Sequence, residues 1–176
     1  MNKYQWILFV IGWATIATAG IAGLSAAPWV PTRKREMQLL IQNIKIKPNS
    51  SVHELGCGTG TIVIALSKKY PNANYFGYEI SIIPYLVAKI RSLTHKNVKI
   101  IYKNLFSKNL SDADYIICFL LTKVYPRLAK KFADELKNDA TVIIEGWPFE
   151  NLQAKKIIKT EKLLPFYIYK GEDFKI

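Results

Sequence analysis

The sequence predicts an α/β fold in which a mostly parallel sheet carries helices on both faces, preceded by one apolar N-terminal helix. Three observations support this prediction. Segments with strand and helix patterns alternate at the spacing of βαβ units. A glycine-rich loop follows the first strand pattern. No charged residue occurs from Tyr4 to Thr32. We therefore expect an N-terminal segment, residues 4–30, and one domain, residues 31–176.

Composition and charge limit the classes of protein to which the chain can belong. Hydrophobic residues make up 50% of it and aromatic residues 12%, enough for a packed core, which argues against disorder. The formal net charge of +12 indicates an acidic partner, such as nucleic acid or an anionic membrane surface. The two cysteines, Cys57 and Cys118, lack partners at metal-ligand spacing. We therefore expect buried, reduced thiols and no metal site.

The N-terminal segment has the length and composition of a transmembrane helix. Residues 6–27 are apolar apart from scattered Gly, Ser and Thr, and about 20 such residues span a hydrocarbon core. Trp6 and Trp29 lie near the two expected interfaces. The basic cluster Arg33-Lys34-Arg35 follows, and the positive-inside rule places it in the cytoplasm. We expect a single-pass membrane protein with a cytoplasmic catalytic domain.

A cleaved secretory signal is the alternative interpretation of this segment. Lys3 precedes the apolar run, and Ser25-Ala26-Ala27 has the small residues of a cleavage site. However, the apolar run is longer than a usual signal core, and the basic cluster follows it closely. Both observations favour a retained anchor that holds the domain close to the membrane.

The first half of the domain is expected to alternate helices and strands. Thr32 is a suitable N-cap for a helix that begins at Arg33. Strand patterns cover residues 51–55 and 74–79, with a helix over residues 60–69 between them. The next helix has Ser81 as its cap and tolerates Pro84 in its first turn.

The second half continues the same alternation. Strand patterns cover residues 98–102, 115–121 and 141–145, and a helix covers residues 126–136. The last two segments, residues 157–163 and 166–169, lie on either side of Pro165. We expect them to form a closing pair of strands.

Residues 52–60, Val-His-Glu-Leu-Gly-Cys-Gly-Thr-Gly, lead from the first predicted strand into a tight loop. Glycines let a ligand approach the backbone, so this is a candidate cofactor loop. The dinucleotide fingerprint G-x-G-x-x-G is excluded, because Thr61 stands three places after Gly58. A phosphate-binding P-loop is excluded because no Gly-Lys-Ser/Thr follows.

Polar residues follow the ends of the predicted parallel strands, where open α/β sheets bind their ligands. Glu54, Glu79 and Asn104 fall at or just beyond these ends. Glu79 has the acceptors for a ribose diol, although a solvated surface carboxylate is the alternative. Asn104 is placed to bind an adenine edge, although an Asn in a turn fits equally well.

These motifs resemble the seven-strand, class I S-adenosylmethionine (SAM) dependent protein-lysine methyltransferases. This family includes archaeal broad-specificity enzymes and mitochondrial enzymes that act on the ATP synthase c-subunit and the adenine nucleotide translocase. The resemblance covers about Pro28 to the C-terminus. The matching motifs are Pro-Trp-Val-Pro-Thr (28–32), Glu-Leu-Gly-Cys-Gly-Thr-Gly (54–60), Gly-Tyr-Glu (77–79), Asn-Leu-Phe (104–106), Phe-Leu-Leu-Thr (119–122) and Trp-Pro-Phe (147–149).

The resemblance implies a Rossmann-like fold, SAM as the cofactor and methyl transfer to a lysine of a protein substrate. By the resemblance, the cofactor-binding residues are Glu54, Gly56, Gly58, Gly60, Glu79, Asn104, Leu105 and Phe119. The acceptor-lysine channel would be lined by Phe119, Leu120, Thr122 and Trp147.

The candidate catalytic residues are Thr122, Glu145 and Trp147. A lysine, whose reference pKa is about 10.4, must lose its proton before it accepts a methyl group, and a hydroxyl or carboxylate near the amine can help. An enzyme tethered to a membrane meets other membrane proteins at a high effective concentration. We therefore expect a membrane-associated protein substrate.

Two other functions stay open. One is methylation of a lipid or small molecule at the membrane surface. The other is a catalytically silent SAM-binding protein, because the family usually has Asp and Arg where this chain has Thr59 and Thr61. The family also usually has Asp where Glu54 stands, which keeps the charge. No nucleic-acid partner is expected, because the Asn/Asp-Pro-Pro-Tyr element of base methylation is absent after the fourth predicted strand.

Overall fold

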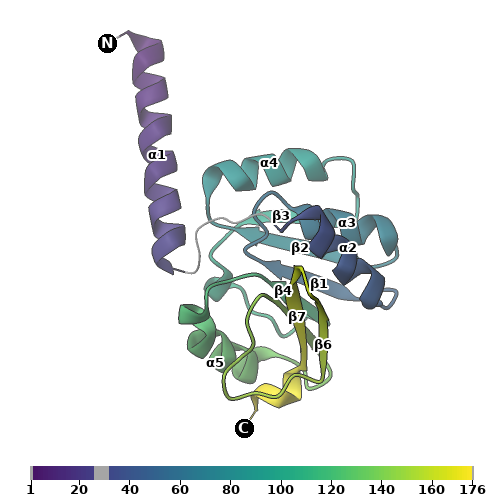
Figure 1. The fold of residues 1–176 in the computed structure, drawn as a ribbon. Helices are drawn as coiled ribbons and strands as arrows, with labels where there is room; N and C mark the ends of the chain where they lie inside the picture. Colours follow the sequence, from purple (N-terminus) through teal and green to yellow (C-terminus); the bar gives the residue numbers. More distant parts are fainter. Residues whose placement is uncertain (1, 26–31, 176) are drawn as a thin grey trace.

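The computed structural model describes residues 2–25 and 32–175, and it forms one seven-stranded sheet with helices on both faces (Figure 1). The strands are β1 (Ser51–Leu55), β2 (Asn74–Glu79), β3 (Val98–Tyr102), β4 (Tyr115–Cys118), β5 (Thr141–Glu145), β6 (Lys156–Thr160) and β7 (Leu163–Lys170). The α-helices are α1 (Lys3–Ser25), α2 (Lys34–Asn43), α3 (Thr61–Lys69), α4 (Ile82–Ser92) and α5 (Tyr125–Glu135). Three short 3-10 helices are η1 (Leu105–Ser107), η2 (Thr122–Val124) and η3 (Gly171–Phe174).

The strand order is β3-β2-β1-β4-β5-β7-β6. Strands β1 to β5 run parallel, and β7 pairs antiparallel with both β5 and β6. The chain moves outward from β1 to β3 and then returns to place β4 on the other side of β1. This is a topological switch point, the place where open α/β sheets bind ligands. The expected α/β fold with a mostly parallel sheet is therefore confirmed.

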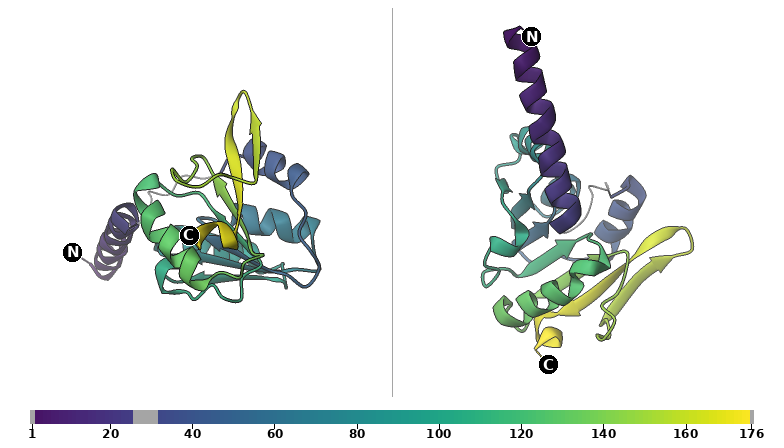
Figure 2. Two further views of the ribbon diagram at one scale, coloured as in Figure 1. Left: turned by 90° about the horizontal axis from the view of Figure 1, so that it is seen from below. Right: turned by 90° about the vertical axis from the view of Figure 1, so that its left-hand side faces the viewer.

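Two apolar cores cover the two faces of the sheet. Helices α2, α3 and α4 pack on one face, where Leu40, Leu66 and Ala88 are fully buried. Helix α5 and η3 pack on the other face (Figure 2), where Leu128 and Phe132 are fully buried. Successive strand residues point to opposite faces. Neighbouring residues at the end of a strand therefore point into different cores, one on the α2–α4 face and one on the α5 face.

The predicted strands at residues 51–55, 74–79, 98–102 and 141–145 match the observed bounds. Strand β4 is shorter than predicted and ends at Cys118 instead of residue 121. Cys118 pairs with Leu55, the last residue of β1, and β1 then turns into the glycine loop. Residues 119–121 have no strand partner on that side, so they leave the sheet and lead into η2.

The closing pair of strands is confirmed, but the prediction that Pro165 separates them is wrong. Pro165 lies inside β7, and the chain turns before Leu163. The ladder between β6 and β7 is irregular between Ile158 and Thr160, close to the proline, which has no N–H to donate. On the other side, the Pro165 carbonyl accepts a 2.9 Å hydrogen bond from the Gly146 N–H.

The N-terminal segment forms α1, but the expected transmembrane helix over residues 4–30 is not supported. In the part of the chain that the structure describes, every helix is too short or too weakly apolar to cross a membrane. Trp29 and the rest of residues 26–31 lie outside the described residues.

Thr32 does not cap α2 as predicted. Arg33 occupies the N-cap position and its side chain makes no capping bond. The Thr32 hydroxyl instead donates a hydrogen bond to Glu145 at the end of β5. The tertiary contact is preferred because the carboxylate it reaches is buried and needs a donor.

Candidate active site

The glycine loop between β1 and α3 is held in left-handed backbone conformations. Gly56, Gly58 and Gly60 have φ angles of 77°, 52° and 74°, which side chains of L-residues disfavour. The N–H groups of Gly56 and Cys57 both donate to the Tyr78 carbonyl at 2.9 Å. A Cβ on Gly56 would also lie 3.3 Å from the Leu120 side chain. The loop therefore presents bare backbone at the switch point.

Glu79 organises this loop. Its Oε2 accepts from the Gly58 N–H at 2.9 Å, and its Oε1 accepts from the Ile80 and Ser81 N–H groups at 2.8 and 2.7 Å. Ser81 is the predicted N-cap of α4, but its backbone makes the contact and its side chain makes no capping bond. Three bonds leave about one of the roughly four lone-pair positions of a carboxylate for a ribose hydroxyl.

Glu54 points to the start of α3. Its Oε2 accepts from the Val63 N–H at 3.0 Å, and the residue is only 6% exposed. Burial raises the pKa of Glu54 well above its usual value, and the nearby Glu145 and Glu79 carboxylates raise it further against the lowering effect of the Val63 bond. Glu54 thus fixes the first turn of the helix that follows the glycine loop.

Arg91 on α4 closes the outer side of the loop, a contact that the sequence analysis missed. One of its guanidinium nitrogens lies 2.8 Å from the Thr59 carbonyl, 3.1 Å from the Thr59 hydroxyl and 3.3 Å from the Thr61 hydroxyl. Thr59 and Thr61 are two of the three positions where the sequence analysis finds a departure from the usual family pattern. An arginine 30 residues away supplies the cation, and no local signal links it to the loop.

Asn104 and Leu105 follow β3. The Asn104 Oδ1 accepts from the Phe106 N–H at 3.0 Å and so caps η1, which leaves the amide nitrogen as a donor for a ligand. Leu105 is 7% exposed and belongs to the core on the α5 face. Both interpretations of Asn104, a turn residue and a ligand donor, are compatible with this geometry.

Aromatic side chains meet where β4 and β5 end. Phe119 and Trp147 stack with ring centroids 6.3 Å apart and an interplanar angle of 20°. Gly146 between β5 and Trp147 has φ 101°, and a Cβ there would lie 3.2 Å from the Phe119 ring. The glycine therefore allows the two rings to approach. Trp147 remains 45% exposed, so the pair forms an aromatic wall at the surface.

A buried carboxylate pair lies beside this wall. Glu145 and Glu36 are each 1% exposed. The Glu145 Oε2 accepts a 2.8 Å hydrogen bond from the Thr32 hydroxyl, whereas the Glu36 Oε2 has no hydrogen-bond partner. Burial raises the pKa of Glu145 to about 7, with the Glu36 charge raising it and the Thr32 bond lowering it. An unpaired buried acceptor is costly unless a donor or cation reaches it.

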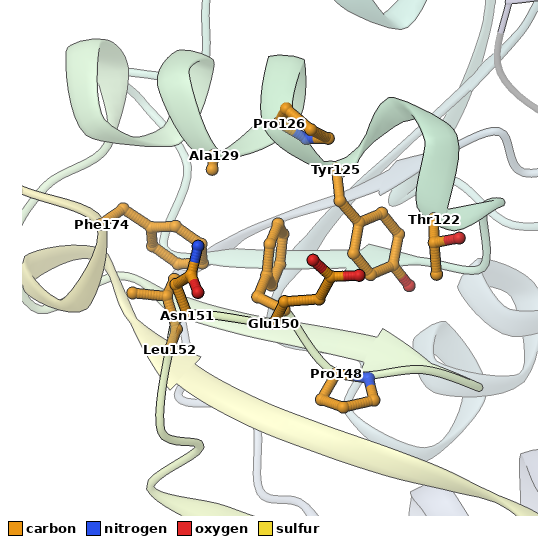
Figure 3. Close-up of a pocket in the computed structure, with 10 residues that line it drawn as sticks. Thr122, Tyr125, Pro126, Ala129, Pro148, Glu150, Asn151, Leu152 and Phe174 are labelled. Atoms are coloured by element: carbon orange, nitrogen blue, oxygen red, sulfur yellow. The ribbon is translucent and has the colours of Figure 1, made fainter.

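The third predicted catalytic residue is Thr122. It is exposed at the start of η2 and lines a cavity of about 290 Å³ between α5 and the loop after β5. Figure 3 shows Thr122 and Tyr125 at one end of this cavity and Phe174 at the other. The Tyr125 hydroxyl donates to the Trp147 carbonyl at 3.1 Å, which connects the cavity wall to the aromatic pair.

The remaining titratable groups of the first strand are structural. His53 is fully buried between Phe76 and Tyr78, and its Nδ1 lies 3.1 Å from the Tyr78 hydroxyl. Burial lowers the pKa of His53 to about 4, against the opposing charge of Asp112. Cys57 and Cys118 are buried free thiols, as expected. Among the described residues, no group of His, Cys, Asp or Glu has the arrangement of a metal site.

The structure thus gathers most of the predicted site residues at one edge of the sheet. Glu54, Glu79 and Glu145 end strands β1, β2 and β5 or stand one residue before the end. The strand pairing sets Glu54 level with Gly77 and Ile143, so Glu79 and Glu145 lie two residues nearer the carboxyl edge and on the same face of the sheet. The glycine loop, Asn104 and Phe119 complete this edge. Thr32, Glu36 and Arg91 come from elements outside the strand ends, so position along a strand did not identify them.

Comparison with known proteins identifies a methyltransferase domain. The family described as the ANTKMT methyltransferase domain matches residues 54–156. A protein-lysine N-methyltransferase from Saccharolobus islandicus is 29% identical over 76% of this chain and 85% of its own length. The human lysine N-methyltransferase named for the ATP synthase c-subunit is 30% identical over 69% of this chain and 52% of its own length.

Solved structures show the same fold. An RNA methyltransferase from Salinibacter ruber, crystallised with S-adenosyl-L-homocysteine, superposes with a TM-score of 0.75 at 20% identity. The match covers 80% of this chain and 93% of that protein. This likeness concerns the fold alone.

Proposed function

The chain belongs to the ANTKMT methyltransferase family and is a SAM-dependent methyltransferase, and from this we propose that its acceptor is the ε-amino group of a lysine in a protein. Two relatives with this specificity in their names, the archaeal and the human enzyme, support the choice of acceptor. The observation that carries the proposal is the buried pair Glu36 and Glu145, because two carboxylates with an unpaired oxygen suit a cationic amine.

The residues at the sheet edge fit SAM. The left-handed turns at Gly56, Gly58 and Gly60 hold bare loop backbone at the strand ends, where SAM would lie against it. Glu79 would take a ribose hydroxyl with its remaining lone pair, and the amide nitrogen of Asn104 would donate to adenine. The buried Glu54 carboxyl would face the cationic methionine part of SAM, whose positive charge would favour the ionised form of this carboxyl. SAM, when bound, supplies a methyl group on a positively charged sulfur.

The acceptor amine would enter beside Phe119 and Trp147. Methyl transfer to nitrogen is an in-line displacement, so the protein mainly orients the amine and excludes water. The stacked rings would provide the apolar wall for the lysine side chain. The ionised Glu145 carboxylate would receive the proton that the lysine ammonium loses, with Thr32 holding one of its oxygens.

We also propose that the substrate is associated with a membrane and that the catalytic domain works on its cytoplasmic side. Helix α1 exposes large apolar side chains, among them Leu8 at 69% and Trp13 at 59%. Arg33, Lys34 and Arg35 are all exposed at the start of the domain. Apolar surface beside basic residues favours an anionic lipid surface.

The test is methyl transfer to the natural substrates. The purified chain is incubated with SAM carrying a labelled methyl group and with membranes and soluble extract of its own host. We expect label in a membrane-fraction protein, on lysine residues identified by mass spectrometry. Gly56→Arg, which fills the glycine loop, should abolish the label, whereas Glu161→Arg in the exposed turn before β7 should not.

The other outcomes overturn the proposal in distinguishable ways. Label that partitions into the lipid extract would mean a lipid acceptor. Binding of SAM by calorimetry without transfer to any fraction would mean a catalytically silent protein. Label confined to soluble proteins would retain lysine as the acceptor and remove the membrane location.

A further inference from the structure

Helix α4 exposes an apolar stripe on the outside of the domain. Ile83, Leu86, Val87, Ile90 and Leu93 are 48%, 50%, 38%, 67% and 73% exposed. Their spacing of i, i+3, i+4, i+7 and i+10 places them along one side of the helix. The opposite side packs on the sheet through the buried Ala88 and Ser92. Both faces of α4 therefore carry apolar side chains, and those of the outer face are exposed in the described chain.

The stripe is not covered by α1. The two helices contact each other, and Figure 1 shows α4 at the outer edge of the domain with α1 beside it. The five side chains of the stripe nevertheless remain 38–73% exposed beside α1. A contiguous apolar patch on the surface of a folded domain marks an interaction site.

The segment of the chain that contains the stripe carries charge of one sign. Between Ile80 and Leu110 the sequence has six basic residues and no acidic residue. The basic residues are Lys89, Arg91, Lys96, Lys99, Lys103 and Lys108, and all but Lys108 are exposed. An exposed apolar helix face flanked by lysine and arginine matches helices that lie in the interface of an anionic membrane.

We propose that the α4 stripe and its basic surroundings dock on an anionic membrane surface. The inference rests on the proposed membrane location and adds a second contact to it. The stripe would enter the boundary between headgroups and acyl chains, and Lys89 and Lys96 would meet the lipid phosphates. Aliphatic side chains favour lipid over nucleic acid, whose binding surfaces use aromatic and polar groups.

Docking in this way would place the cofactor edge close to the bilayer. Helix α4 starts three residues after Glu79, and its 11 residues span about 16 Å. Arg91 on the same helix contacts Thr59 in the glycine loop. A lysine near the surface of a membrane protein would thus be within reach of the site, whereas a lysine far from the bilayer would not.

The experiment places a fluorescent probe on the stripe. Both native cysteines are buried, so a single added cysteine can be labelled selectively in the full chain. Ile90→Cys carries an environment-sensitive dye, and Ile157→Cys on β6, 50% exposed, is the matched control. On vesicles of phosphatidylcholine with phosphatidylglycerol, the dye at position 90 should shift to the blue and be quenched by spin-labelled acyl chains. The dye at position 157 should not respond.

Charge is tested separately in the unlabelled chain. Lys89→Gln and Lys96→Gln should each weaken binding to anionic vesicles by about fivefold, because a lysine near such a surface contributes that much. Lys159→Gln on β6 should have no effect. SAM binding, measured by calorimetry, should be unchanged in all these variants, so a loss there would indicate damage to the enzyme and not to docking.

Three results would overturn the inference, and none of them touches the lysine acceptor, because vesicle binding is measured without methyl transfer. The protein could bind vesicles while the dye at position 90 reports water, which would assign binding to another surface. The dye could be shielded without vesicles as protein concentration rises, which would mean that a second copy covers the stripe. Protection of position 90 by an RNA oligonucleotide and not by vesicles would assign the surface to nucleic acid.

Discussion

Glu145 and Glu36 form a buried carboxylate pair, and in the proposed function this pair would bind the acceptor amine. Each is buried, one oxygen of Glu36 has no partner, and the pKa of Glu145 is raised to about 7. The charged groups that face Glu145 are Glu36 from α2 and Glu54 from β1. All are acidic, so the arrival of a cationic amine would lower the pKa of Glu145 and favour its ionised form.

We predict that Glu145→Gln removes an ionisation from the pH profile of methyl transfer. In the proposed mechanism the ionised Glu145 carboxylate would accept the proton, and its raised pKa means that this form is lost as pH falls below about 7. In the natural chain kcat/KM should therefore rise with pH through this region. The variant should be slower by about 100-fold or more and lack this rise. Kinetics from pH 5.5 to 9 give the measurement.

Glu161→Gln, in an exposed turn, is the matched control and should keep the natural profile. SAM affinity should be the same in both variants, because Glu145 lies on the acceptor side. If Glu145→Gln retained the full rate and the same pH dependence, another group would have to take the proton.

At the scale of the elements, strand β2 depends on a single small residue for its packing against the glycine loop. Gly77 lies in the strand, and a Cβ there would stand 2.8 Å from the Cys57 Sγ and 2.9 Å from the Ile100 Cδ1. The glycine thus allows the start of the glycine loop to pack directly on the strand. The conformation of the loop depends on this packing as well as on its own glycines.

We predict that Gly77→Ala lowers the free energy of unfolding by about 1–3 kcal/mol, the usual cost of forcing extra atoms into a packed core. Adding Ile100→Val, which removes one of the two clashing atoms, should restore part of this loss. Urea denaturation of the two single variants and the double variant measures the coupling.

Gly12→Ala on α1 is the control, because nothing lies within 4 Å of a Cβ at that position. It should leave stability unchanged or slightly increased, since alanine favours a helix. Simple additivity of Gly77→Ala and Ile100→Val would contradict the assigned contact.

The whole molecule joins one cofactor edge to two apolar layers and a basic outer surface. The edge is assembled from the ends of several strands and the loops that follow them, so SAM binding should stabilise the entire sheet. We predict that SAM at about 100 times its Kd raises the free energy of unfolding by about 2.7 kcal/mol. Glu79→Gln should reduce this gain, because it weakens the bonds to Gly58, Ile80 and Ser81.

Thermal unfolding with and without SAM measures this effect, and Glu161→Gln again serves as the control. An equal gain in the natural chain and in Glu79→Gln at the same SAM concentration would show that Glu79 contributes nothing to cofactor affinity.

The alternation of strands and helices, the glycine loop and the candidate residues at strand ends followed from the sequence alone. These features could be predicted because each depends on a local pattern of residues. Apolar periodicity fixes the type of an element, parallel strands bring their ends to one edge, and left-handed turns require glycine. Residues 51–55 and 74–79 form strands with the predicted bounds, and Glu54 and Glu79 end up at the expected edge.

Only the tertiary structure decided which partners these residues have. Glu79 binds backbone N–H groups of its own loop, Thr32 bonds with Glu145 instead of capping α2, and Arg91 reaches Thr59 and Thr61. Pro165 lies within β7, where the irregular ladder accommodates it. Such contacts join residues far apart in the chain, and they form because burial makes each unpaired polar group costly. The free-energy cost of an unpaired buried group depends on the folded structure, so a local sequence pattern does not predict these contacts.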